Sequence, residues 1–334
     1  MSAERDGQPD DLLVLDGVTV SFPARHGSIR AVDGVDLRVG RREIIALVGE
    51  SGCGKTTLIR SIVGLETPTG GTIRFAGEAV TPRSLRALRR RVQMIFQDPT
   101  GALNPRHRVV QAVAEGLVIH RVAGDHRAQA AAALERAGLR PAERFLDRYP
   151  HEISGGQRQR VLIAGAIVLA PELLLADEPV ASLDASIRGE VLALMRSLVD
   201  EHGLSMIVVT HDLGLAWNIA DRIAVMYLGR IVEEGPTEDL LAEPKHPYTE
   251  ALLSVVPESR RMEQQILEGE TPDAARIPDG CRFHPRCPVV ASGEAERLGI
   301  LDRCLHVDPS LEWTGPRAVA CHLTHRTRDP ERQF

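Results

Sequence analysis

The sequence predicts an α/β fold built on a parallel sheet, and three observations support this prediction. Between residues 161 and 232, apolar strand-like segments alternate with helical segments, which is the pattern of βαβ units. Residues 12–48 alternate apolar and polar side chains between Gly and Pro, which indicates an antiparallel β region. After residue 243 come repeated prolines and four of the five cysteines. We therefore expect one α/β domain over residues 1–243 and a separate cysteine-bearing extension over residues 244–334.

The composition excludes several classes of protein. With 43% hydrophobic and 26% charged residues, the chain is not disordered as a whole. A net charge of −6 and only 3% aromatic residues argue against a surface that binds nucleic acid. The longest apolar runs, Val161–Ala170 and Leu173–Ala176, are too short to span a membrane, and the polar, acidic N-terminus does not resemble a secretory signal. We expect a cytosolic protein that reaches a membrane only through a partner.

The β region at the start of the chain leads into a buried strand and then into a phosphate-binding loop. Ile44–Val48 is continuously apolar, as expected for a strand covered on both faces. Residues 49–56 match the pattern G-x-x-x-x-G-K-[ST] in full and precede a plausible helix, Thr57–Val63. Backbone N–H groups of such a loop surround phosphates, Lys55 supplies positive charge, and Thr56 offers a hydroxyl to Mg²⁺. The residues expected to bind ATP here are Gly49, Glu50, Ser51, Gly52, Cys53, Gly54, Lys55, Thr56 and Thr57.

A second strand-like segment, Leu173–Ala176, ends in the two carboxylates of Asp177 and Glu178. In proteins with a phosphate loop, the first such acid orients the Mg²⁺ shell, which is the role expected for Asp177. Glu178 is placed to polarise an attacking water, which is the task of a general base.

The segment Ile153-Ser154-Gly155-Gly156-Gln157 resembles the signature motif of ATP-binding cassette (ABC) ATPases, with Ile in place of the usual Leu. Ser-Gly-Gly at the start of the predicted helix Gln157–Ala170 presents N–H groups, a hydroxyl and the positive helix end to an anion. A plain helix cap is the alternative. The position of the motif, after the phosphate loop and before Asp177, favours the signature.

Four further positions match the same family, and their roles are implied by the resemblance. Gln97 looks like the glutamine that reaches Mg²⁺ and the attacking water, and His211 looks like the histidine that donates to the γ-phosphate. Ser182-Leu183-Asp184 looks like the loop that crosses the dimer seam, with Asp184 near the nucleotide. Phe22 occupies the place of the aromatic residue that stacks on adenine. Taken alone, each of these residue types is more often structural.

The resemblance covers residues 12–243 and implies a P-loop NTPase fold with a RecA-like core. It adds an antiparallel β subdomain and an α-helical subdomain over about residues 98–165, where the segment Ala128–Ala137 is the clearest helix. Members of this family act as head-to-tail dimers. The loop Ser154, Gly155, Gly156 and Gln157 would then complete the nucleotide site of the partner subunit.

Two segments of the tail narrow the choice within the family. Residues 246–253 (HPYTEALL) and 280–288 (GCRFHPRCP) resemble the C-terminal extension of dipeptide, oligopeptide and nickel importer ATPases, and residues 154–160 and 178–187 look like the second ATPase of such systems. The resemblance implies two transmembrane permease subunits, an extracytoplasmic substrate-binding protein and a peripheral place at the cytoplasmic face of the cell membrane. It favours a heterodimer with a second ABC ATPase subunit, and leaves a homodimer open. The alternatives are an oligosaccharide or nickel importer ATPase, and a soluble regulatory or repair ABC ATPase.

The clustered cysteines of the tail are the remaining candidate site. In a cytosolic protein such clustering favours a metal or cluster site over disulfides. Four thiolates suit a [4Fe–4S] cluster, whereas the absence of a C-x₂-C pair weakens a Zn²⁺ site. Four reduced cysteines packed in a small core are the plain alternative. Peptide importers with this tail carry such a cluster, so the resemblance favours iron–sulfur. The expected ligands are Cys281, Cys287, Cys304 and Cys321, and in a Zn²⁺ site His284, His306 or His322 could replace one of them.

Overall fold

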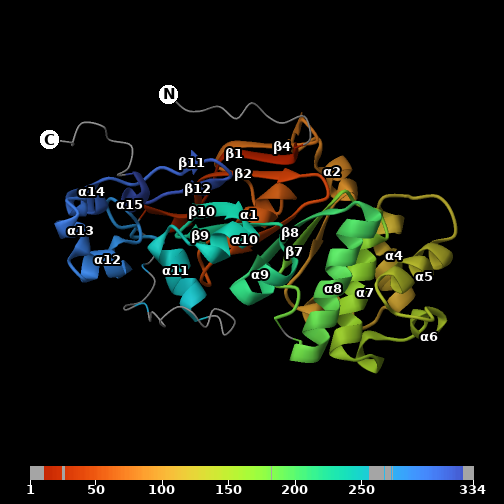
Figure 1. Cartoon of the computed structure of the whole chain (residues 1–334). Helices are drawn as coiled ribbons and strands as arrows, with labels where there is room; N and C mark the ends of the chain where they lie inside the picture. Colours follow the sequence, from red (N-terminus) through yellow and green to blue (C-terminus); the bar gives the residue numbers. More distant parts are fainter. Residues whose placement is uncertain are drawn as a thin grey trace.

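The computed structural model describes residues 11–24, 27–181, 183–255, 267, 272 and 274–325. The strands form two sheets, one with four strands in the order β2-β1-β4-β5 and one with eight in the order β11-β12-β10-β9-β3-β8-β7-β6. The helical region lies at one end of the molecule and the C-terminal extension at the other (Figure 1). No helix in these described residues has the length and apolarity needed to cross a membrane.

The four-stranded sheet confirms the predicted antiparallel β region. Its strands are β1 (Asp11–Ala24), β2 (Gly27–Gly40), β4 (Gly70–Phe75) and β5 (Glu78–Ala79), and β1 pairs antiparallel with both β2 and β4. Side chains alternate across a strand, and a register shift between Leu15 and Val18 lets Val18 and Val20 face the same buried core as Leu13 and Leu15. That core lies between this sheet, α1 (Lys55–Ile62) and one face of the larger sheet.

The larger sheet contains the predicted parallel strands. β3 pairs with β8 and β9, and β7 pairs with β6 and β8, all in parallel. Every residue of β3, β7 and β8 is buried, because helices or the smaller sheet cover both faces. The strands are β3 (Ile44–Val48), β6 (Val92–Ile95), β7 (Leu173–Asp177), β8 (Ser205–Thr210), β9 (Arg222–Tyr227) and the antiparallel β10 (Arg230–Pro236). The helices that accompany them are α2 (Leu85–Arg91), α8 (Ala185–His202), α9 (Leu213–Ile219) and α10 (Thr237–Ala242).

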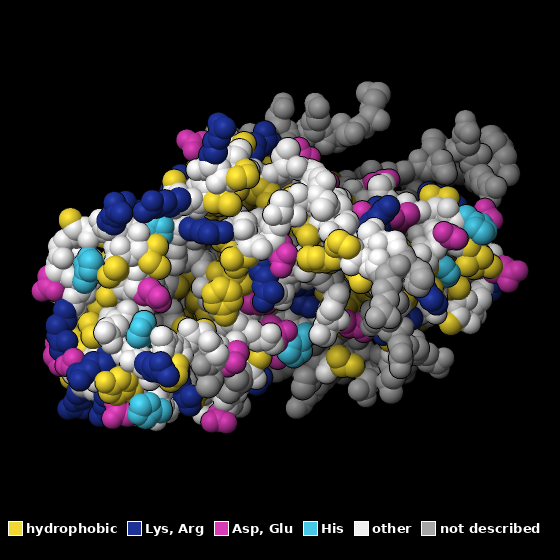
Figure 2. Space-filling model, turned by 180° about the vertical axis from the view of Figure 1, so that it is seen from behind, with side chains coloured by type: hydrophobic (Ala, Val, Ile, Leu, Met, Phe, Trp, Pro, Cys, Tyr) yellow, Lys and Arg dark blue, Asp and Glu magenta, His cyan; other side chains and the backbone are white. Residues whose placement is uncertain are grey.

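The helical region expected near residues 98–165 is a small bundle. α4 packs against α5 and α7 through Val113, Ala133 and Ala164, which are fully buried. α5 begins at Asp125, whose carboxylate accepts hydrogen bonds from the N–H groups of Arg127 and Ala128. On the outer face, Lys and Arg side chains mix with apolar ones (Figure 2). The elements are α3 (Pro99–Ala102), α4 (Val109–Ile119), α5 (His126–Arg136), α6 (Glu143–Leu146), the 3₁₀ turn η1 (Pro150–Glu152) and α7 (Gly155–Ile167).

The C-terminal extension packs against the larger sheet. β12 pairs antiparallel with β10, and the rings of Tyr248 and Phe283 lie buried against Tyr227 of β9. Pro247, Pro285 and Pro288 lie in the first turns of its helices. Its elements are α11 (Pro247–Ser254), the 3₁₀ turn η2 (His284–Arg286), α12 (Pro288–Ala291), α13 (Glu294–Arg297), α14 (Leu301–His306), β11 (Glu312–Thr314), β12 (Arg317–Val319) and α15 (His322–His325).

Candidate nucleotide-binding site

The predicted phosphate loop joins the end of β3 to the start of α1, as expected. Two of its glycines are required by close contacts with neighbouring backbone. A Cβ atom on Gly49 would lie 2.2 Å from the carbonyl oxygen of Met226, and one on Gly54 would lie 2.0 Å from that of Ala31. Gly54 also has a φ of 108°, which L side chains rarely adopt. The loop therefore follows a path that only glycine allows at these points.

The side chains of Lys55 and Cys53 are both buried at this loop, and the Nζ atom of Lys55 donates to Sγ of Cys53 at 3.6 Å. The Nζ atom of Lys55 donates to the carbonyl oxygens of Gly49 at 2.7 Å and Glu50 at 2.8 Å, so its charge lies within the loop. The Cys53 side chain is buried beneath the loop, and burial raises the pKa of its thiol. The side chain of Cys53 thus belongs to the core, so this residue can bind a phosphate only through its backbone N–H group.

Two of the three residues expected to hold Mg²⁺, Thr56 and Asp177, meet directly. The Thr56 hydroxyl donates to Oδ1 of Asp177 at 2.9 Å, joining the start of α1 to the end of β7. Asp177 is almost fully buried, and burial raises the pKa of its carboxyl. Oxygen ligands from a hydroxyl and a carboxylate are the kind that Mg²⁺ prefers, so these residues fit the ion.

Glu178 is the centre of a second group of side chains. Its Oε2 accepts from the Gln97 amide at 2.9 Å, and its Oε1 lies 3.1 Å from Nδ1 of His211. These three residues follow the adjacent parallel strands β6, β7 and β8, whose carboxyl ends share one edge of the sheet. Glu178 adopts a φ of 45°, a strained value for a residue other than glycine. An amide and an imidazole therefore hold one carboxylate, an arrangement that can orient a water.

The segment that resembles the signature motif starts α7, as predicted. Ser154 is the N-cap: its hydroxyl accepts from the N–H of Gln157 at 3.3 Å, and the Gln157 side chain accepts from the N–H of Ser154 at 3.0 Å. A Cβ atom on Gly156 would lie 2.7 Å from the Ile187 side chain of α8, so that position also needs glycine. Ser154 and Gly155 are exposed. The motif lies on the helical region, whereas α1, which follows the phosphate loop, lies under the antiparallel sheet (Figure 1).

The remaining predicted nucleotide contacts lie at the ends of other elements. Phe22 lies near the end of β1 and is only partly packed against the core, so part of its ring is accessible. Asp184 is the exposed N-cap residue of α8. Ser182 lies outside the described residues.

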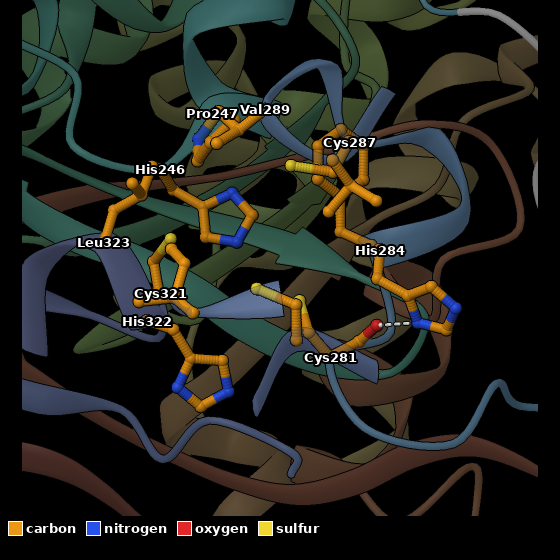
Figure 3. Close-up of a pocket in the computed structure, with 13 residues that line it drawn as sticks. His246, Pro247, Cys281, His284, Cys287, Val289, Cys321, His322 and Leu323 are labelled. Carbon is orange, nitrogen blue, oxygen red and sulfur yellow. Dashed lines mark hydrogen bonds between the residues drawn. The ribbon is translucent and has the colours of Figure 1, made fainter. Parts of the chain in front are cut away.

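The four cysteines of the extension surround one pocket. Cys281, Cys287 and Cys321 face it together with His246, and Cys304 also lines it (Figure 3). All are free thiols, and burial raises the pKa of Cys281 and of Cys321 to about 12. Across the described part of the chain, no three His, Cys, Asp or Glu side chains converge closely enough to hold a single metal ion.

The histidines named for a zinc alternative take different places. His284 and His322 line the pocket, and His284 is bound through Nδ1 to the carbonyl oxygen of Cys281 at 2.9 Å. His306 is exposed and lies 3.8 Å from the carboxylate of Asp302. His246, which sequence reasoning passed over, is fully buried, and burial lowers its pKa to about 3. Only its place in the motif HPYT, beside a Pro that begins a helix, could have drawn attention to it.

Comparisons with known proteins agree with this geometry. Residues 32–181 match the ABC transporter family model, and residues 232–293 match the oligopeptide/dipeptide transporter C-terminal region. A Brucella abortus protein named "Putative peptide import ATP-binding protein" is 45% identical over 302 residues, covering 88% of this chain and 87% of that protein. A Brucella suis protein of the same name is 42% identical over 313 residues, covering 91% and 95%.

Solved structures give the same result. A dimeric post-hydrolysis structure of the ATP-binding cassette MJ0796 with ADP and phosphate has a TM-score of 0.61 and 29% identity, covering 67% of this chain and 98% of that one. The cbiO1 protein of Clostridium perfringens, part of the ABC transporter complex cbiONQ, has a TM-score of 0.63 and 30% identity, covering 70% and 92%. The fold and the site thus define a P-loop ATPase of the ATP-binding cassette class. The chain belongs to the ABC transporter ATP-binding proteins, in the branch with the oligopeptide/dipeptide transporter C-terminal region.

Proposed function

We propose that this chain is the ATP-hydrolysing subunit that powers import of dipeptides or oligopeptides through a membrane permease. The single observation that carries ATP hydrolysis is the Glu178 carboxylate held between Gln97 and His211 beside the phosphate loop. The peptide substrate is supported by the C-terminal region that the chain shares with its relatives. Replacement of Glu178 by Gln tests the first part, and uptake of labelled peptides by cells lacking the gene tests the second.

Each group of residues in the site has a separate role in ATP hydrolysis. Lys55 and the N–H groups of residues 49–57 bind the phosphates, and Phe22 stacks on the adenine. Thr56 and Asp177, with Gln97, would hold Mg²⁺, which would supply charge to neutralise the phosphate oxygens. Glu178 accepts the proton of the attacking water, and an Nδ1–H group of His211 donates a hydrogen bond to that carboxylate and so orients it.

The second half of each site comes from a partner ATP-binding subunit. The start of α7 has Ser154 and Gly155 exposed and Gly156 and Gln157 partly exposed, and its N–H groups and helix dipole favour an anion. A phosphate loop and a signature loop of one chain cannot face the same nucleotide, so two chains must pair head to tail. Asp184, exposed at the start of α8, lies at the proposed seam. The partner that fits the motifs is a second, different ATP-binding subunit.

The helical region over about residues 98–165 is the proposed docking face for two transmembrane permease subunits at the cytoplasmic side of the membrane. Large apolar side chains are exposed there, with Val118 at 62% and Ile119 at 58%, and Phe96 at its border is 41% exposed. Crosslinks from this face to a permease, in membranes that also contain the substrate-binding protein, support the proposal. Crosslinks confined to the C-terminal extension contradict it.

We also infer that the four cysteines of the extension hold a [4Fe–4S] cluster. Each thiolate of such a cluster binds a different iron, so the sulfur atoms must surround a space instead of converging on one point. Cys281, Cys287, Cys304 and Cys321 line a common pocket, which supports this proposal. Anaerobically purified protein should be brown, absorb broadly near 400 nm (roughly the range of iron–sulfur proteins) and contain about four iron atoms per chain. Colourless protein with one zinc, or with no metal, contradicts this proposal.

A further inference from the structure

The C-terminal extension touches the phosphate loop at one residue, Glu50. Both carboxylate oxygens of Glu50 accept hydrogen bonds from the guanidinium of Arg286, at 2.8 and 2.9 Å. The backbone N–H of Glu50 donates to the hydroxyl of Tyr248 at 2.9 Å. Side chain and backbone of this loop residue are therefore both held by residues that lie far along the chain, in the extension.

Both contacts are well shielded from water. The Arg286 side chain is 7% exposed, and its hydrogen bonds to Glu50 raise its pKa, so it stays charged. Tyr248 is fully buried among the rings of Tyr227 and Phe283, with centroids 4.7 and 5.4 Å away. Burial also raises the pKa of Tyr248, which keeps its hydroxyl protonated. Paired, charge-assisted hydrogen bonds of this kind are among the strongest in proteins.

A second route joins the same segment of the extension to the far side of the loop. Arg282 forms a buried ion pair with Asp33 and donates to the carbonyl oxygen of Leu228 at 2.5 Å. The next residue, Gly229, donates its N–H to the carbonyl oxygen of Cys53 in the loop, at 2.9 Å. Arg286 thus binds the loop directly, and Arg282 is linked to it through Leu228 and Gly229.

The negative charge of Glu50 explains why these contacts matter for nucleotide binding. A carboxylate in a loop that binds triphosphate repels the ligand unless a positive group neutralises it. Lys55 does not do this, because its ammonium group contacts loop carbonyl oxygens. Arg286 is bound to both oxygens of that carboxylate, whose side chain is 27% exposed, so it both neutralises and orients Glu50.

We propose that Arg286 and Tyr248 are positioning residues for the phosphate loop, so that the nucleotide affinity of this chain depends on its C-terminal extension. This inference rests on the proposed nucleotide site. Arg286 removes the repulsion between Glu50 and the phosphates, and Tyr248 fixes the backbone of the loop at the same residue. Neither touches the nucleotide itself.

The segment that carries both arginines is also the one that carries two of the cysteines. Arg282 follows Cys281 directly, and Arg286 precedes Cys287 directly, with the short turn η2 between them. The two arginines and the two cysteines therefore belong to the same short segment.

The test measures binding of a fluorescent ATP analogue with Mg²⁺ to the full-length chain, before turnover. Arg286→Gln should raise the Kd on the order of tenfold, because it leaves an unneutralised carboxylate in the loop. The double variant Glu50→Gln with Arg286→Gln should recover most of the affinity, because the repelling charge is gone. Tyr248→Phe should raise the Kd roughly two- to tenfold by removing one hydrogen bond, and it carries the test if Arg286→Gln does not fold.

Two control variants separate this proposal from simpler causes. Arg317→Gln breaks another contact of the extension, between Arg317 and the buried Glu233 at 2.7 Å, and leaves the side chains of Arg286 and Tyr248 in place. It should lower the melting temperature and leave the Kd unchanged. An equal loss of affinity in Arg317→Gln, or no recovery in the double variant, overturns the positioning role. Lys55→Ala should abolish tight binding; if it binds like the wild type, the proposed nucleotide site itself is wrong, whatever Arg286→Gln does.

Discussion

Replacement of Glu178 by Gln should nearly stop ATP hydrolysis and leave ATP binding intact. The amide has the shape of the carboxylate, so it can still accept from Gln97 and contact His211, at the positions that now lie 2.9 and 3.1 Å from the carboxylate oxygens. What it loses is the ability to take a proton from water. General-base catalysis contributes about 10²- to 10⁴-fold, which corresponds to about 3–5 kcal/mol in the activation barrier.

The assay is release of phosphate by the assembled transporter at saturating ATP, with nucleotide binding measured separately. The bound state should also accumulate as an ATP-trapped dimer on size exclusion, because closure no longer leads to cleavage. Glu172→Gln is the matched control. Glu172 immediately precedes β7, at the opposite end of the strand from Asp177, where Arg91 and Arg41 bind it. Wild-type turnover in Glu178→Gln, or an equal fall in Glu172→Gln, refutes the role of Glu178.

Three further predictions follow from particular contacts. Lys55→Ala should weaken nucleotide binding in its own subunit, whereas Ser154→Arg should spare that binding and block closure on the nucleotide of the partner; equal loss of binding in both isolated subunits contradicts a shared site. The hydrogen bond from Arg91 lowers the pKa of Glu172 in the folded protein. The ionised Glu172 should therefore stabilise the fold fully above its unfolded pKa near 4.5, and this stabilisation should be lost as the pH falls through the lower folded pKa. Urea unfolding of Glu172→Gln should therefore differ from the wild type at neutral pH and converge with it in acid. Val118→Asp, at an exposed position of α4, should reduce peptide uptake in cells without changing the ATPase rate of the isolated subunit, and unchanged uptake would argue against docking at this face.

The strands of the central sheet could be predicted because each one is specified by its own consecutive residues. Each of β3, β7 and β8 is a short apolar run, and burial on both faces requires that composition whatever the neighbours are. The phosphate loop is local in the same sense, since a few consecutive residues both shape it and bind the ligand. The start of α7 followed from Ser154, whose capping interaction with Gln157 spans only three residues.

The contacts of the C-terminal extension could not be predicted in this way. β11 and β12 have three residues each, too few for a period to show, and β12 is a strand because β10 offers it an edge. The hydrogen bonds between Glu50 and Arg286 join residues 236 positions apart, and the sequence around either residue does not indicate its contact with the other. The proline content of this segment indicates breaks between elements and contains no information on what those elements pack against.

The two groups of active-site residues, Thr56 with Asp177 and Gln97 with Glu178, bring together parts of the chain that are distant in sequence. Thr56 meets Asp177, and Gln97 meets Glu178, across separations of more than 80 residues, since the hydrogen bonds link positions 121 and 81 apart. These contacts nevertheless follow from the strand order, because parallel strands that lie side by side have their carboxyl ends at one edge of the sheet. β7 is the shared neighbour of β6 and β8, so the residues after it must lie between those that follow the other two. A substitution that shifts β7 by one residue would therefore separate Asp177 from Thr56 and Glu178 from both of its partners at once, although it alters no side chain that touches the nucleotide.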